Sequence, residues 1–225
     1  MLGTGSTVLF LGKACDKHTE LALAFCRSKF AAIEAHLGQW GDPIPAGLDA
    51  WTGEYIISYL SRWIVPERLL KNARIASINF HPGPPEYPGY GGNNFALYEG
   101  ADIYGVTCHH MAARVDSGDI IAVKRFPLLP TDDVATLLSR AYDQMLDLFF
   151  EIMSGVLSGR ELPVSGEKWV RRPFTKKEFH ALGRITTDMT PEEVARRVRA
   201  TTFGPYRPTI VLHGFIFEYK ARRSE

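Results

Sequence analysis

An asparagine and a histidine stand two positions apart where an apolar segment gives way to a proline-rich loop. The segment is residues 75–80, and the two polar residues are Asn79 and His81. If the segment is a β-strand, both side chains project from the same face, because successive residues point to opposite faces. An amide can donate a hydrogen bond to a carbonyl oxygen, and an imidazole can exchange a proton near neutral pH. The pair could therefore polarise a carbonyl and move a proton, although an Asn-x-His pair also fits a structural role.

A carboxylate that could join this pair lies in a later turn. Asp116 belongs to the turn 115–118, between the apolar runs 104–111 and 120–126. Aspartate often serves only to form such turns. A carboxylate at this place could instead reach His81, fix its tautomer and raise its proton affinity. The residues alone leave both roles open.

The rest of the chain supplies the elements that would position these residues. A strand, a glycine loop and a helix follow one another at the start, which predicts an α/β sheet. In such sheets ligands bind at the carboxyl ends of the strands, where Asn79 and His81 stand. Strands are predicted at residues 7–12, 55–60, 75–80, 104–111 and 120–126. Helices are predicted from about residue 20 and at residues 66–70, 94–98 and 131–157, and Thr131 is expected to cap the last of them.

The residues after about 160 differ in pattern from those before. Two threonine–glutamate pairs have the spacing of helix caps, and residues 209–219 predict a β-hairpin around His213 and Gly214. We therefore expect two domains. A core at 1–160 would carry the catalytic residues, and a small α+β subdomain at 161–225 would end in the hairpin.

Composition and charge narrow the class of protein. Of 225 residues, 26 are Lys or Arg and 25 are Asp or Glu, which gives a formal net charge of +1. Nucleic-acid binders usually have a strongly basic face, so we expect no nucleic-acid partner. The three cysteines are scattered, no metal-ligand cluster is visible, and the early apolar run 8–11 is too short to span a bilayer. These features predict a soluble cytoplasmic protein with no membrane partner and no metal.

The two polar clusters resemble the folate-dependent formyltransferases. The motifs that match are Asn-x-His-Pro-Gly at 79–83 with Pro-Gly at 88–89, and Val-Asp-Ser-Gly-Asp-Ile-Ile at 115–121. The resemblance extends over residues 7–157. It implies a doubly wound formyltransferase-type sheet core and N10-formyltetrahydrofolate as the co-substrate, without a metal.

The resemblance also implies roles for individual residues. Asn79 would hold the formyl oxygen and stabilise the oxyanion, and His81 would share that task or accept a proton from the attacking amine. Asp116 would orient His81 and tune its charge. The residues expected to bind the folate are Trp63, Ile64, Val65, Ala113, Val115 and Asp116.

Three segments resemble the sugar-nucleotide branch of this family. They are the loop 82–89, the run 109–111 and the run 199–203. The resemblance implies that the amine belongs to a dTDP-linked amino-dideoxy sugar, most closely dTDP-4-amino-4,6-dideoxyglucose, a precursor of bacterial surface polysaccharides. A dTDP-3-amino sugar, methionyl-tRNA, hydrolysis of formyltetrahydrofolate and non-catalytic binding of a nucleotide sugar remain as alternatives.

The same resemblance suggests where the acceptor would bind. The tyrosines of the loop would pack on the hexose, the asparagines after it would bind hydroxyls or phosphate, and a lysine after the first strand would meet the pyrophosphate. The residues concerned are Lys13, Tyr87, Tyr90, Asn93, Asn94 and His109. Loop packing, helix capping and a solvated lysine are the alternative roles.

The predicted terminal hairpin has more apolar side chains than a small subdomain would cover. They are Ile210, Leu212, Phe215 and Phe217. In the sugar branch this region pairs two subunits, so the resemblance implies a homodimer through the hairpin. Burial within one subunit is the alternative.

Overall fold

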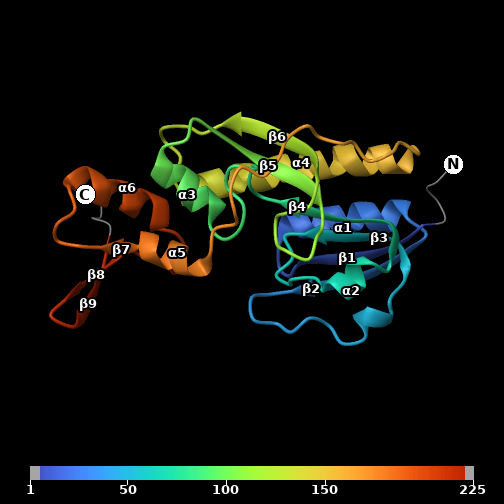
Figure 1. Ribbon diagram of the computed structural model, residues 1–225, viewed down its shortest axis with the longest axis horizontal. Coiled ribbons are helices and arrows are strands. Elements are labelled where there is room, and N and C mark those ends of the chain that lie inside the picture. Colours follow the sequence, from blue (N-terminus) through green and yellow to red (C-terminus); the bar gives the residue numbers. More distant parts are fainter. Residues whose placement is uncertain (1–5, 221–225) are drawn as a thin grey trace.

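The structure of the protein is a computed structural model that describes residues 6–220. It has an α/β fold with one large and one small sheet (Figure 1). The large sheet consists, in spatial order, of β2 (Ala32–Gly38), β1 (Thr7–Lys13), β3 (Gly53–Tyr59), β4 (Ala73–His81), β5 (Ile103–His110) and β6 (Ile120–Pro127). The first four strands in this order are parallel, and β5 and β6 are antiparallel to their neighbours. The predicted fold class is confirmed, with a mixed sheet.

One strand of the sheet was not among those predicted. The strand β2 lies at the edge beside β1, and most of its residues are at least partly exposed. Its sequence places Glu34 and His36 among apolar residues, so it lacks the continuous apolar run of a strand that is buried on both faces. An edge strand with a single packed face therefore gave too weak a signal.

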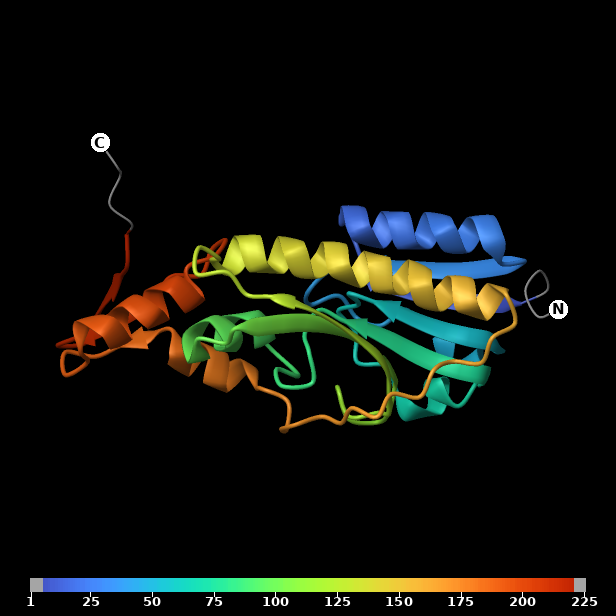
Figure 2. The ribbon, with the colours of Figure 1, turned by 90° about the horizontal axis from the view of Figure 1, so that it is seen from above.

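Helices cover the two faces of the large sheet unequally. The helices α1 (Lys17–Lys29) and α4 (Val134–Leu157) lie together on one face (Figure 2), over a core that includes Phe80 and Phe149. The short helix α2 (Glu67–Leu70) packs on the other face, over a smaller core around Leu9. These two layers hold β4 in the middle of the sheet with its carboxyl end free for a site.

The cap of α4 differs from the prediction. Thr131 was expected to cap this helix, but the N-cap residue is Asp133. The Asp133 carboxylate accepts a hydrogen bond from the backbone N–H of Thr136, and the Thr136 hydroxyl accepts one from the backbone N–H of Asp133. This reciprocal pair satisfies two backbone donors, which a cap at Thr131 would leave unpaired.

The C-terminal elements lie beyond one end of the large sheet (Figure 1). They are α5 (Lys176–Leu182), β7 (Arg184–Ile185), α6 (Pro191–Thr201), β8 (Thr209–Leu212) and β9 (Phe215–Glu218). The predicted hairpin is confirmed, and both of its turn residues, His213 and Gly214, have positive φ angles. Helix α6 packs against α3 (Gly92–Glu99). The Asn94 side chain joins the two helices by donating to the carbonyl of Ala200, 2.6 Å away.

A long connecting segment returns from the end of α4 to α5 along the face of the sheet that carries α2 (Figure 2). We call residues 159–174 the strap. The strap makes backbone hydrogen bonds to two other segments. Its Ser165 N–H donates to Ile120, and its Val170 N–H donates to Pro85. The strap is therefore tied both to the start of β6 and to the proline-rich loop that follows β4.

Candidate active site

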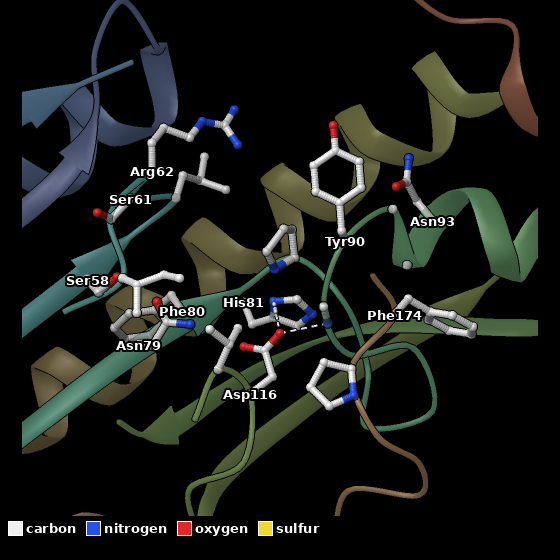
Figure 3. Close-up of a pocket in the computed structure, with 18 of the residues that line it drawn as sticks. Ser58, Ser61, Arg62, Asn79, Phe80, His81, Tyr90, Asn93, Asp116 and Phe174 are labelled. Carbon is white, nitrogen blue, oxygen red and sulfur yellow. Dashed lines mark hydrogen bonds and ion pairs between the residues drawn. The ribbon is translucent and has the colours of Figure 1, made fainter. Parts of the chain in front are cut away.

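A pocket of about 600 Å³ opens at the carboxyl ends of β3 and β4. This is where α/β sheets place ligands. Asn79 and His81 line it from β4, and Asp116 lines it from the loop between β5 and β6 (Figure 3). The neighbouring β4 residues Ile78 and Phe80 are buried in the core under α4. Asn79 and His81 thus share the face opposite α4, as their spacing predicts.

Asp116 reaches His81. Its Oδ2 atom lies 3.4 Å from His81 Nδ1 and accepts a hydrogen bond of 2.7 Å from the backbone N–H of Gly89. The Asp116 residue is 5% exposed and has a φ angle of 44°, in the left-handed region that few non-glycine residues occupy. The contact that the sequence left open is present, and the local backbone is held in an uncommon conformation to make it.

His109 stands between the other polar residues of the site. Its Nδ1 lies 2.7 Å from the carbonyl oxygen of His110, so this nitrogen donates a hydrogen bond to that carbonyl. Its Nε2 lies 3.1 Å from the Asn79 amide and 3.4 Å from Asp116 Oδ1. In the neutral ring this Nε2 accepts from the amide, and in the charged ring it donates to the carboxylate. His109, which was predicted to contact the acceptor, therefore connects Asn79 with Asp116 within the polar cluster.

Burial and charge act in opposite directions on the two central groups. Burial raises the pKa of Asp116, but His81, His109 and the N–H of Gly89 together outweigh it and hold the pKa at about 2. Burial lowers the pKa of His81 below its ordinary value, although the Asp116 carboxylate and the Tyr87 carbonyl favour the charged ring. At neutral pH the pair therefore consists of a carboxylate and a neutral imidazole.

The second nitrogen of His81 faces the proline-rich loop. Its Nε2 atom is buried and makes no hydrogen bond of normal geometry within residues 6–220. It packs against Gly83, where a Cβ would come within 2.7 Å of it. The imidazole therefore lines the pocket with its Nδ1 on the Asp116 side and its Nε2 on the side of this loop.

The predicted folate-binding residues divide into two groups. Trp63, Ile64, Val65 and Val115 line the pocket, whereas Ala113 is exposed and does not. Ile64 and Val115 expose 72% and 45% of their surface, which is unusual for large apolar residues. Apolar walls with a few polar groups suit the flat ring of a pterin. The residues present thus fit a folate, which they would hold between the segment after β3 and the loop after β5.

The predicted acceptor-binding residues also divide. Tyr90, Asn93, Asn94 and His109 line the pocket, and Tyr87 and Lys13 do not. The Tyr87 hydroxyl donates to Glu99, and Lys13 forms an ion pair of 2.7 Å with Asp16. Asn94 donates to a carbonyl of α6, as described above, which is the structural alternative that the sequence offered.

Four aromatic residues that line the pocket form a group, of which only Tyr90 was predicted. The group, which we call the aromatic rim, comes from four separate segments and consists of Trp40, Tyr90, Phe179 and Tyr206. The Tyr90 and Tyr206 hydroxyls are 3.2 Å apart, and the ring centroids of Trp40 and Tyr90 are 5.8 Å apart. The Arg62 guanidinium lies 4.9 Å above the Trp40 ring. No local pattern in the sequence indicates that these residues lie together. A tryptophan in a loop is nevertheless a signal that could have marked Trp40 as a candidate site residue.

Comparison with known proteins identifies related sequences. Residues 42–153 match the family model described as formyl transferase. A methionyl-tRNA formyltransferase from Macrococcus caseolyticus is 34% identical over 160 residues, which are 69% of this chain and 50% of that protein. The chain spans about half the length of the curated relatives that it matches.

Solved structures resemble the chain over nearly its whole length. A likely sugar N-formyltransferase from Mycobacterium tuberculosis has a TM-score of 0.77 at 20% identity, covering 96% of this chain and 97% of that one. A 4-N formyltransferase from Francisella tularensis has a TM-score of 0.76 at 17% identity, covering 97% and 98%. An N-formyltransferase from Helicobacter canadensis, solved with folinic acid and dTDP-3-aminofucose, has a TM-score of 0.69 at 16% identity, covering 92% and 84%. At these identities the likeness establishes the fold.

Proposed function

We propose that this chain, whose residues 42–153 match the formyl transferase family, transfers a formyl group from N10-formyltetrahydrofolate to the amine of a dTDP-linked amino sugar. One observation carries the proposal. A buried imidazole lines the pocket, and a carboxylate is held 3.4 Å from its Nδ1. Formyl transfer to an amine needs such a proton acceptor beside a group that binds the carbonyl oxygen.

Each polar residue then has a task in the transfer. The Asn79 amide has two N–H groups, so one can donate to His109 while the other donates to the formyl oxygen as negative charge develops there. The His81 imidazole takes the proton that the amine loses when its nitrogen bonds to the formyl carbon. The bond between that carbon and N10 of the carrier breaks, and His81 can return the proton to N10. Asp116 stabilises the imidazolium that forms in between.

The co-substrate would lie against the apolar walls. Trp63, Ile64 and Val65 would hold it on one side and Val115 on the other, and the bound folate would supply the activated formyl group. The N-formyltransferase from Helicobacter canadensis was solved with folinic acid, which supports a folate in this fold. The proposal includes no metal.

The aromatic rim supports a nucleotide sugar as the acceptor. A thymine base can stack on aromatic side chains, and Arg62 is a cation beside them that could meet a diphosphate. The Helicobacter canadensis protein, with a similar fold, was solved with dTDP-3-aminofucose. We propose dTDP-4-amino-4,6-dideoxyglucose as the first acceptor to test. Methionyl-tRNA is the second candidate, because the curated relatives carry that name.

Mass spectrometry tests the proposal directly. The protein is incubated with N10-formyltetrahydrofolate and dTDP-4-amino-4,6-dideoxyglucose, and the molecular mass of the sugar nucleotide is measured. A product heavier by one formyl group supports both the reaction and the acceptor class. Free formate with an unchanged sugar would identify a hydrolase, and formylation of methionyl-tRNA alone would replace the acceptor. No transfer to either amine and no formate would overturn the proposal.

We predict that the reaction tolerates mild acid. His81 must be neutral to accept a proton, and burial lowers its pKa, so the neutral ring persists below pH 6.5, the ordinary imidazole value. The kcat at saturating substrate should therefore hold as the pH falls to 6.5 and decline only at lower pH, where the imidazole becomes charged. An NMR titration of the His81 imidazole, assigned with the His81→Ala variant, checks the cause independently of the acceptor amine. A His81 pKa above 6.5 would contradict this account.

We also propose a homodimer formed through the terminal hairpin. Phe215, Ile216, Val211 and Phe217 expose 70%, 70%, 59% and 53% of their surface. The paired Val211 and Ile216 lie on one face of the hairpin and the two phenylalanines on the other, and exposed apolar groups that gather in one region commonly mark contact sites. Size-exclusion chromatography with light scattering should give twice the mass of one chain. Ile216→Ser should weaken the dimer, whereas Val164→Ser, an exposed valine of the strap, should not. A monomeric wild-type protein would exclude the dimer.

A further inference from the structure

The strap contacts two loops of the site, the proline-rich loop after β4 and the loop between β5 and β6. Towards the proline-rich loop, the Val170 N–H donates to Pro85, and the Phe174 N–H donates to Pro88. Towards the loop between β5 and β6, the Trp169 indole N–H donates to the carbonyl of Gly118, 2.7 Å away. One short stretch of the strap therefore joins the loop after His81 to the loop that carries Asp116.

The Trp169 ring also covers the imidazoles of the site. Its edge-to-face contact with His109 has a centroid distance of 5.0 Å and an interplanar angle of 87°. The corresponding contact with His81 has a distance of 6.2 Å and an angle of 72°. Side chains packed in this way favour one ring orientation and exclude water from the covered surface.

The loop that bears Asp116 has few other attachments. Residues 112–115 and Ser117 are exposed, so apolar packing does little to hold this segment. The Asp116 backbone is in the left-handed region, a conformation that persists only when its surroundings enforce it. The Gly118 backbone lies so close to β5 that a Cβ there would come within 1.9 Å of the His110 carbonyl oxygen. The hydrogen bond from Trp169 acts on this same tightly placed residue.

We infer that Trp169 is a positioning residue, which holds the Asp116 loop against His81 through its bond to Gly118 and shields the His81 and His109 rings from water. The inference rests on the proposed function, because it assigns Trp169 a part in the same site. Trp169 lies outside the residues matched by the family model, so the strap adds a contribution from beyond the matched core.

Two substitutions separate the two contributions of Trp169. Trp169→Phe keeps an aromatic cover and removes the N–H, so the Asp116 loop loses its attachment while the rings stay shielded. Trp169→Ala removes both. We expect kcat to fall about 10-fold in the first variant and about 10²-fold in the second, as small displacements of catalytic groups can cause. The KM for the acceptor should stay near its wild-type value, because Trp169 does not line the pocket.

The titration of His81 gives a readout that a purely structural role would not move. The titratable groups facing His81 are Asp116, from the loop, and His109, from β5. In Trp169→Phe the Asp116 carboxylate moves away, so the His81 pKa should fall further. In Trp169→Ala water enters, and since burial is the largest cause of the low value, the pKa should rise. NMR of the imidazoles without any substrate measures both shifts.

Trp51→Phe is the matched control, because Trp51 precedes the amino end of β3 and packs in the smaller core. It should leave kcat and the His81 titration unchanged. Wild-type kcat and titration in both Trp169 variants would overturn the inference, and so would a fall in kcat without any movement of the pKa. If Trp169→Ala fails to fold, Trp169→Phe carries the test. If the wild-type protein transfers no formyl group, the proposed function fails, and the titration alone then decides whether Trp169 holds Asp116 against His81.

Discussion

Replacement of His81 by alanine is expected to lower kcat by at least ~10²-fold, the scale of a lost acid–base group. The variant has no imidazole to take the proton from the amine, and Asp116 has no group to orient. Binding should change less, because the aromatic rim and the apolar walls are untouched. Steady-state kinetics by mass spectrometry of the product, with both substrates saturating, measures the effect.

Two further measurements make the His81 result specific. His36→Ala is the matched control, because His36 lies on β2, away from the pocket, and pairs with Glu34 at the surface. It should keep wild-type activity. Imidazole added to His81→Ala should restore part of the rate, since the pocket of about 600 Å³ has room for it. Circular dichroism should show that the fold is retained. Near-wild-type turnover in His81→Ala would remove His81 from the mechanism.

We expect Asp116→Asn to lower kcat by at least ~10²-fold as well, although the side chain keeps its size. The carboxylate, with its pKa held at about 2, is charged throughout the working pH range and raises the proton affinity of His81. The amide carries no charge to stabilise the imidazolium. In addition, an amide N–H in place of Oδ2 would face the Gly89 N–H, so that two donors would meet.

The Asp116 prediction has a control three residues along the chain. Asp119 is exposed, and its carboxylate lies 3.8 Å from the Lys168 ammonium group. Asp119→Asn makes the same chemical change and should leave kcat unaltered. In Asp116→Asn the His81 pKa should fall, because the carboxylate that raises it is gone. An active Asp116→Asn variant with an unchanged His81 titration would show that Asp116 only shapes the turn.

Local patterns predicted the parts of the fold that depend on neighbours in sequence. The buried strands β1 and β3 consist largely of apolar runs, and the alternation along β4 correctly placed Asn79 and His81 on one face. The prediction failed for a strand at the edge of the sheet and for a helix cap at which two residues compete. The edge strand β2 was missed, and Asp133 rather than Thr131 caps α4 because only Asp133 has a threonine at the reciprocal position.

The site was predicted less completely than the fold, because its walls come from distant parts of the chain. The contact between His81 and Asp116 could be suggested from residue types, but its geometry could not. Lys13 lay at the correct end of its strand, yet a nearby aspartate holds its ammonium group away from the pocket. The aromatic rim and Trp169 depend on where the segments after α4 return, and no periodicity encodes that path. The domain division after residue 160 and the roles of the site residues stay predictions.

The position of the strap affects the order in which the protein can mature. The large sheet uses residues up to 127 and α4 ends at Leu157, so a nascent chain can assemble this layered body first. Trp169 bonds to Gly118 across 51 positions, and Val170 bonds to Pro85 over a still longer separation. Such closures carry an entropic cost that local contacts do not. On the ribosome, the chain would therefore pass through a stage in which the large sheet and its helices are folded but the proton-transfer centre is not yet assembled. Catalytic activity would appear only after the strap has been made and has bound to both loops.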